Sequence, residues 1–220
     1  MAGTVALALA LPASPLAAIK NIVYTPNGAG GGELFIEGTL DGPNNISVRE
    51  KLNVKTGEKF LEISDPAGLL GSVFPANCTL VDDGDLSTPY TTIRCPVAGV
   101  TLINVRGGDS GNDTVTFDLE TPIKTYTDVG GGDDIVSGGP GPDTQVGGAG
   151  NDQLLGGRGG DGQSGGPGND DITGDAGNDR QSGGAGNDFL HGGKGRDQGT
   201  GGKGTDKCRK VESGEPDCVM

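Results

Sequence analysis

Residues Val129–Arg209 consist of nine consecutive nine-residue blocks that align without a gap: VGGGDDIVS, GGPGPDTQV, GGAGNDQLL, GGRGGDGQS, GGPGNDDIT, GDAGNDRQS, GGAGNDFLH, GGKGRDQGT and GGKGTDKCR. Every block has glycine at its fourth position and aspartate at its sixth. The aspartates are Asp134, Asp143, Asp152, Asp161, Asp170, Asp179, Asp188, Asp197 and Asp206. A degenerate block, Gly108–Thr116 (GDSGNDTVT), precedes a 12-residue break. Copies in register at a fixed period indicate units that stack on their neighbours.

The composition of the whole chain favours an all-β fold. The chain has 45 glycines among 220 residues, 4% aromatic residues and no tryptophan. Because glycine costs roughly 1 kcal/mol per helix-interior position relative to alanine, helix bundles and doubly wound α/β enzymes are disfavoured. Residues 19–128 add short β-rich runs separated by turn residues, among them ELFIEGTL, NISVREKLNV and VTLINV. This alternation predicts strands and shows no group of residues suited to catalysis.

The repeated blocks resemble the RTX, or haemolysin-type calcium-binding, nonapeptide G-G-x-G-x-D-x-U-x, in which U is a large apolar residue. In that family GGxGxD forms a turn and xUx a short strand, and two blocks complete one turn of a right-handed parallel β-roll. The resemblance covers 81 of 220 residues. It implies a two-sheet solenoid with calcium between successive turns on each edge, preceded by a β-rich N-terminal cap or small β domain.

A turn of two blocks places every second aspartate on the same edge. One edge then carries Asp134, Asp152, Asp170, Asp188 and Asp206, and the other carries Asp143, Asp161, Asp179 and Asp197. Neighbouring strands lie about 4.7–4.9 Å apart, so each edge becomes a column of carboxylates that repel one another. Calcium takes about 6–8 oxygen ligands, from carboxylates and carbonyls alike, whereas magnesium demands tight octahedral geometry and retains water. We therefore expect several Ca²⁺ ions, about one for each same-edge pair.

The apolar content of the blocks is too small to hold them folded without metal. Ordering 18 residues costs roughly 18–36 kcal/mol of backbone entropy, whereas each buried aliphatic side chain returns about 1.5–3 kcal/mol. The eighth position is apolar or cysteine in odd blocks, but it is Gln145, Gln163, Gln181 and Gly199 in even blocks. The glutamines predict either a stacked ladder of amides or a partly open face for binding or self-association. We expect residues 19–128 to fold without calcium and 129–209 to require it.

The termini and cysteines point to export. The apolar run Val5–Leu11 followed by small residues is typical of a signal peptide over residues 1–18. It is too short for a transmembrane segment, which needs about 20 apolar residues. The cysteines pair by position as Cys78 with Cys95 and Cys208 with Cys218, which predicts two local disulfides, with four unpaired thiols as the alternative. The second disulfide would clip residues 210–220 onto the roll (129–209) as a cap.

The function expected from these features is that of a secreted, non-enzymatic calcium-binding protein. The net charge of −14 disfavours nucleic acid as a partner. Matches to a nucleophile elbow at Gly162–Gly166 and to G-x-G-x-x-G at Gly157–Gly162 fall inside the repeat register, and the lone His191 has no catalytic partner. Two alternatives stay open: a fragment of a larger secreted hydrolase, and a surface or adhesion module. A cell-surface, glycan or self-association partner is not identified.

Overall fold

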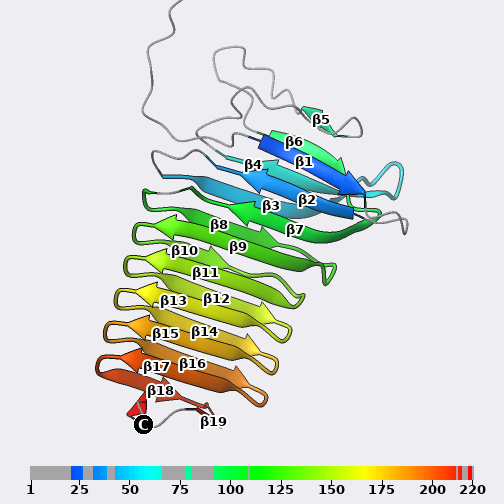
Figure 1. The fold of residues 1–220 in the computed structure, drawn as a ribbon. Coiled ribbons are helices and arrows are strands. Elements are labelled where there is room, and N and C mark those ends of the chain that lie inside the picture. The colour runs from blue at the N-terminus through cyan, green and yellow to red at the C-terminus, as the bar shows by residue number, and fades with distance from the viewer. Residues whose placement is uncertain are drawn as a thin grey trace, which may run out of the picture.

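A computed structural model describes residues 21–26, 32–38, 43–65, 78–80, 92–108, 110–211, 213–214 and 218–219. In this part of the chain there are strands and turns and no helix, and the strands stack as a solenoid that runs from the N-terminal strands to the C-terminus (Figure 1). None of the described residues forms a helix of the length and apolarity that crossing a bilayer requires. The signal-peptide-like segment 1–18 lies outside the described residues.

One sheet has nine strands in the order β1-β2-β7-β9-β11-β13-β15-β17-β19. Their bounds are β1 Asn21–Pro26, β2 Gly32–Glu37, β7 Val100–Arg106, β9 Lys124–Gly131, β11 Asp143–Ala149, β13 Gly162–Pro167, β15 Arg180–Ala185, β17 Gln198–Lys203 and β19 Ser213–Gly214. Only β1 and β2 pair antiparallel, and the pairs from β2 onward are parallel.

The facing sheet has eleven strands in the order β20-β18-β16-β14-β12-β10-β8-β3-β4-β6-β5. Their bounds are β3 Asn45–Leu52, β4 Lys59–Ser64, β5 Thr79–Leu80, β6 Thr92–Pro96, β8 Thr114–Asp118, β10 Ile135–Ser137, β12 Gln153–Arg158, β14 Asp171–Ala176, β16 Phe189–Lys194, β18 Asp206–Arg209 and β20 Cys218–Val219. The antiparallel pairs β3–β4, β4–β6 and β5–β6 lie at the N-terminal end, and parallel pairs form the rest.

The repeats form a parallel β-roll, as the block pattern predicts. Equivalent residues of successive turns are paired 18 positions apart, for example Leu154 with Ile172 and Gln163 with Gln181. Consecutive blocks alternate between the two sheets, so two blocks complete one turn. The turn length and the all-β architecture are therefore confirmed.

The segment between the degenerate block and the first repeat continues the solenoid. The sequence shows only a break here, but β9 (Lys124–Gly131) fills it and pairs with β7 and β11. Its inward residues Thr125 and Thr127 are buried, and their small polar side chains hid the strand from a search for apolar alternation. The two sheets thus pass without interruption from the N-terminal region into the repeats.

The core changes its chemistry along the stack. In the N-terminal turns both sheets contribute buried aliphatic residues, such as Ile36 and Val105 from one sheet and Ile46 and Val115 from the other. In the repeats the aliphatic ladder Val136, Leu154, Ile172 and Leu190 comes from one sheet only. The repeats therefore bury much less apolar surface per turn than the N-terminal turns, which weakens their hydrophobic stabilisation.

The predicted disulfide between Cys78 and Cys95 is confirmed. Cys78 and Cys95 form a disulfide that joins the start of β5 to β6. Cys208 is also disulfide-bonded. The side chain of Cys218, its expected partner, lies outside the described residues, although β20 (Cys218–Val219) pairs with β18.

Candidate metal centre

The sixth-position aspartates form two columns inside the edges of the roll, and each of their side chains is at most 2% exposed. On the first edge the backbone N–H of Asp134 donates to Oδ1 of Asp152 at 2.9 Å, and the bond recurs every 18 residues through Asp170 and Asp188 to Asp206. The second edge repeats the arrangement from Asp143 to Asp197. The two columns expected from an 18-residue turn are thus present.

The second carboxylate oxygen of most of these aspartates is buried without a hydrogen-bond partner in the described part of the chain. These Oδ2 atoms belong to Asp134, Asp152, Asp161, Asp170, Asp179, Asp188 and Asp206. A buried carboxylate oxygen that lacks a donor carries a large desolvation cost. Each of these atoms therefore calls for a proton or a cation.

Eight of the nine blocks begin with glycine, and this glycine leaves room for that carboxylate. A methyl group on Gly165 would overlap Oδ2 of Asp170 and lie 2.8 Å from its Cβ. The same overlap with the aspartate of the block recurs at Gly147, Gly156, Gly174, Gly183, Gly192 and Gly201. At these glycines a side chain would clash with the carboxylate, which occupies the volume of the missing Cβ; the first block differs, because it begins with the buried Val129.

Main-chain carbonyl oxygens share the same space. The position that a Cβ of Gly174 would occupy is flanked by Oδ2 of Asp179 and lies 2.6 Å from the carbonyl oxygen of Gly192, one turn later. Gly156 and Gly183 have equivalent carbonyl neighbours at 2.7 and 2.6 Å. Two oxygen atoms from successive turns therefore face a common point.

The turn loops direct further carbonyls along the stack. In most blocks the glycines at the second and fourth positions have positive φ, a conformation that L side chains rarely adopt; examples are Gly148 at 110° and Gly150 at 137°. A Cβ on Gly148 would overlap the carbonyl oxygen of Gly130, and one on Gly150 would overlap that of Gly132. Each loop thus presents oxygen atoms to the loop of the next turn.

Burial sets the electrostatics of the columns. It raises the pKa of Asp134 and Asp161 to about 7 and that of Asp170 to about 6. The hydrogen bond that each accepts from the previous turn acts in the opposite direction, and neighbouring carboxylates of the same column raise these pKa values further. At neutral pH Asp134 and Asp161 are therefore only partly ionised when no cation is bound.

The second block departs from the pattern. It carries Pro140 and Pro142 in its loop, and the glycines at its second and fourth positions, Gly139 and Gly141, do not have a left-handed φ. In this loop the N–H of Gly139 donates to Oδ2 of Asp143 at 2.8 Å. The carboxylate of Asp143 is therefore satisfied by the protein itself, although its sequence position is the same as that of the other aspartates.

A second ladder, which the sequence analysis did not identify, lies at the fifth position of alternate blocks. The backbone N–H of Asn169 donates to Oδ1 of Asn151, and Asn187 donates in the same way to Asn169. These side chains are exposed. The recurrent Gly-Asn-Asp tripeptide of alternate blocks is the sequence feature from which this ladder could have been predicted. The ladder ties the loops together immediately beside the buried column.

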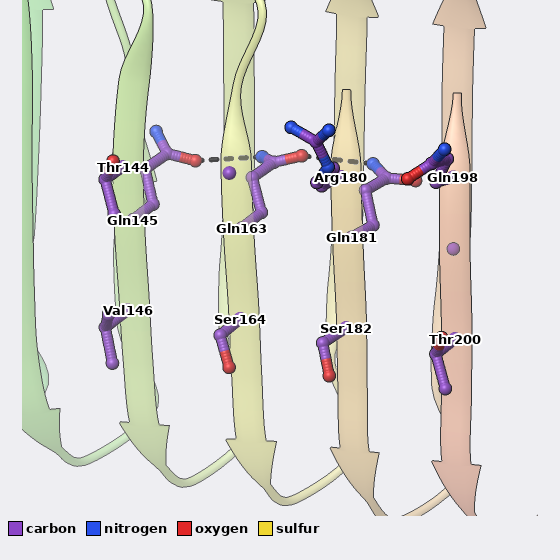
Figure 2. A pocket seen from close by; sticks show the side chains of 12 residues that line it. Thr144, Gln145, Val146, Gln163, Ser164, Arg180, Gln181, Ser182, Gln198 and Thr200 are labelled. Carbon is purple, nitrogen blue, oxygen red and sulfur yellow. Dashed lines mark hydrogen bonds between the residues drawn. The ribbon is translucent and has the colours of Figure 1, made fainter. Parts of the chain in front are cut away.

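The glutamines of the eighth position form the stacked ladder, which is the first of the two alternatives. Nε2 of Gln163 donates to Oε1 of Gln145 at 2.8 Å, and Gln181 donates to Gln163 at 3.0 Å (Figure 2). The same amides donate to carbonyls of the facing sheet, such as those of Leu155 and Thr173. With at most 4% exposure, the glutamines lie in the core and are not an open face.

The outer surface of the same sheet is a shallow groove of small and polar residues. Val146, Ser164, Ser182 and Thr200 follow one another along it, beside a second row that includes Thr144 and Arg180 (Figure 2). Gly162–Gly166, the match to a nucleophile elbow, lies within β13 and is followed by a turn and another strand. The strand–turn–helix context that such an elbow requires is therefore missing there.

Side chains alone do not form a metal site in the described part of the chain. Among the described residues no group of three or more histidine, cysteine, aspartate or glutamate side chains is placed to hold a metal ion. Any cation in the columns would take one or two carboxylates and draw its other ligands from main-chain oxygens. Such an all-oxygen donor set suits a hard divalent cation.

Comparison with known proteins agrees with this geometry. A family model described as the RTX calcium-binding nonapeptide repeat (four copies) matches residues 128–162, 164–181 and 180–208. Residues 128–208 therefore consist of RTX calcium-binding nonapeptide repeats, whose β-rolls are structural calcium-binding units and not typically catalytic. No curated protein and no solved structure gives a significant match.

Proposed function

We propose that this protein is a secreted calcium-binding protein in which Ca²⁺ links successive turns of the roll and drives their folding. The ligands would be the sixth-position aspartates and the carbonyl oxygens of the glycine loops. The bound ion would supply the positive charge that the columns lack. Of the nine aspartates, Asp143 is the least suited, because its Oδ2 already accepts a hydrogen bond.

The observation that carries this proposal is the row of buried Oδ2 atoms without donors. Such an atom on its own would destabilise the fold, yet it recurs in seven of the repeat aspartates. At Gly156, Gly174 and Gly183 a main-chain carbonyl oxygen faces the same point as the carboxylate. Oxygen atoms that face one point repel one another unless a cation or a proton lies between them, and a cation can serve more of them than a proton can.

Calcium fits this donor set better than other biological cations. Zinc and copper favour nitrogen and sulfur ligands, whereas the columns offer oxygen only. Magnesium retains several waters, and these carboxylate oxygens are shielded from solvent. Calcium accepts six to eight oxygens in irregular geometry at about 2.3–2.6 Å. We expect weak sites of the extracellular class, around 10⁻⁴–10⁻³ M each.

The folding role follows from the core. The N-terminal turns bury aliphatic residues from both sheets, whereas the repeats bury them from one sheet and glutamine from the other. Because each repeat turn has a weak core and a buried carboxylate on each edge, cation binding contributes directly to its folding free energy. The N-terminal turns depend less on cation binding, because both of their sheets contribute buried aliphatic residues.

Secretion is supported by two features. The Cys78–Cys95 disulfide is typical of oxidising compartments. Calcium-binding RTX repeats combined with a disulfide are typical of extracellular proteins.

Circular dichroism of the full chain tests the proposal. In EGTA we expect only the β signal of the N-terminal turns. Millimolar calcium should restore the signal of the roll, and the same concentration of magnesium should not. A repeat region that is already fully β-structured in the chelator at neutral pH would contradict the folding role. Failure to bind calcium at all would contradict the whole proposal.

A further inference from the structure

The first aspartate column extends beyond the matched repeats. The backbone N–H of Asp113 donates to Oδ1 of Asp134 at 2.6 Å, as each repeat aspartate does to the next. One turn earlier, the N–H of Asn44 donates to Oδ1 of Asp113 at 2.6 Å. Asp113 and Asn44 therefore occupy two additional sixth positions, although Asn44 lies 69 residues before Asp113.

Asp113 has the environment of the repeat aspartates. Its side chain is 1% exposed, and its Oδ2 is buried without a hydrogen-bond partner in the described part of the chain. A Cβ on Gly107 would overlap this Oδ2, as at the first glycine of the repeats. The segment Gly107–Thr116 (GGDSGNDTVT) is a ten-residue variant of the block, with one residue inserted before the aspartate.

Asn44 meets the same geometry with a different side chain. A Cβ on Gly38 would lie 2.7 Å from Oδ1 of Asn44 and would overlap the carbonyl oxygen of Gly107, one turn later. Here, however, Nδ2 of Asn44 donates to that carbonyl at 2.5 Å. The side-chain amide of Asn44 supplies an N–H donor to this carbonyl, where an aspartate would place a second oxygen against it.

The N-terminal end of the second column is comparable. Thr125 occupies the sixth position one turn before Asp143, and its hydroxyl donates to Oδ1 of Asp143 at 2.8 Å. At its N-terminal end each column therefore has a neutral side chain that donates a hydrogen bond. The two neutral residues mark where each column of carboxylates ends.

We infer that Asp113, which lies before the matched repeats, holds an additional calcium ion together with Asp134 of the first repeat, and that Asn44 is the neutral residue that ends this column. The inference rests on the proposed calcium function. The repeats alone offer four same-edge aspartate pairs on one edge and three on the other. The pair Asp113–Asp134 adds one more.

Native mass spectrometry of the full chain in calcium tests the additional site, because each bound ion adds a discrete mass. Asp113→Asn should hold one ion fewer than the wild type. The matched control Asp118→Asn, at an exposed position nearby, should hold the same number as the wild type. An unchanged count in Asp113→Asn would overturn the inference, whereas a wild type without calcium would overturn the proposed function instead.

The reverse substitution tests the role of Asn44. Asn44→Asp removes the donor to Gly107, so the calcium-free protein should melt at a lower temperature than the control Asn45→Asp, whose side chain is exposed. In calcium the Asn44→Asp variant should hold one additional ion. A melting temperature and ion count equal to those of the control would overturn the assignment. If Asn44→Asp does not fold, the Asp113→Asn count still decides the question.

Discussion

Filling the space beside one carboxylate should disable one calcium position and leave the rest of the roll intact. Gly165→Ala is the sharpest such change, because its Cβ would overlap Oδ2 of Asp170 and lie 2.5 Å from Cγ. The φ of Gly165 is not in the left-handed region, so the backbone tolerates alanine and the effect comes from the overlap alone.

The size of the effect follows from the packing. Asp170 is buried, and its Oδ1 already accepts the N–H of Asp152, so the side chain has little freedom to move aside. Overpacking of this kind costs about 1–3 kcal/mol. If that cost falls on the calcium-bound state, the affinity of the ion beside Asp170 should drop by about 5- to 150-fold.

Calorimetric calcium titration of the full chain measures this loss, and Gly162→Ala provides the matched control. Gly162 also lies in β13, but a Cβ there would have no atom within 4 Å. That variant should bind calcium as the wild type does and gain about 0.5–1 kcal/mol of stability, since alanine is less costly than glycine in a strand. Equal calcium affinities in the two variants would refute the reasoning.

Three further predictions concern the columns and the ladder. Metal-depleted protein should gain roll structure in circular dichroism as the pH falls from 8 to 4. Burial raises the pKa of Asp134 and Asp161 from 3.8 to about 7, so their contribution to stability is full below 3.8 and lost as the pH rises through about 7; a signal that does not change with pH would contradict this. In native mass spectrometry Asp161→Asn should lose calcium, whereas Asp143→Asn should lose less, because Gly139 already donates to Asp143; equal losses would contradict the distinction. Gln163→Leu removes a buried amide from the ladder and should lower the unfolding free energy in calcium by about 1–3 kcal/mol. The control Gln153→Leu, at an exposed position, should change this free energy little. Equal unfolding free energies of the two variants in chemical denaturation would count against a structural ladder.

Much of the fold and of the site could be predicted from the nine-residue period. The period places equivalent residues one above another, which is enough to predict the two columns of aspartates and to align the glutamines, but it does not decide between a buried amide ladder and an open face. The need for glycine at the first position follows only from the structure, where the carboxylate of Asp170 occupies the space beside Gly165. The pattern alone shows that glycine recurs, not which atom excludes a side chain.

Features that depend on loop conformation or on distant partners could not be predicted. Asp143 has the same place in the block as Asp161, but in its proline-containing loop the N–H of Gly139 donates to its second oxygen. Asn44 joins the first column from far away in the sequence, where nothing resembles a repeat. Periodicity reports local stacking, and it does not report which neutral residue ends the stack.

Hydrogen–deuterium exchange of the full chain, followed by mass spectrometry with EGTA or with millimolar calcium, tests the central claim most directly. The account predicts that amides of β6 to β8 are protected in both conditions, whereas those of β12 to β17 are protected only with calcium. Equal protection of β12 to β17 in the chelator and in calcium, at neutral pH, would show that the roll stands without metal and would contradict the account.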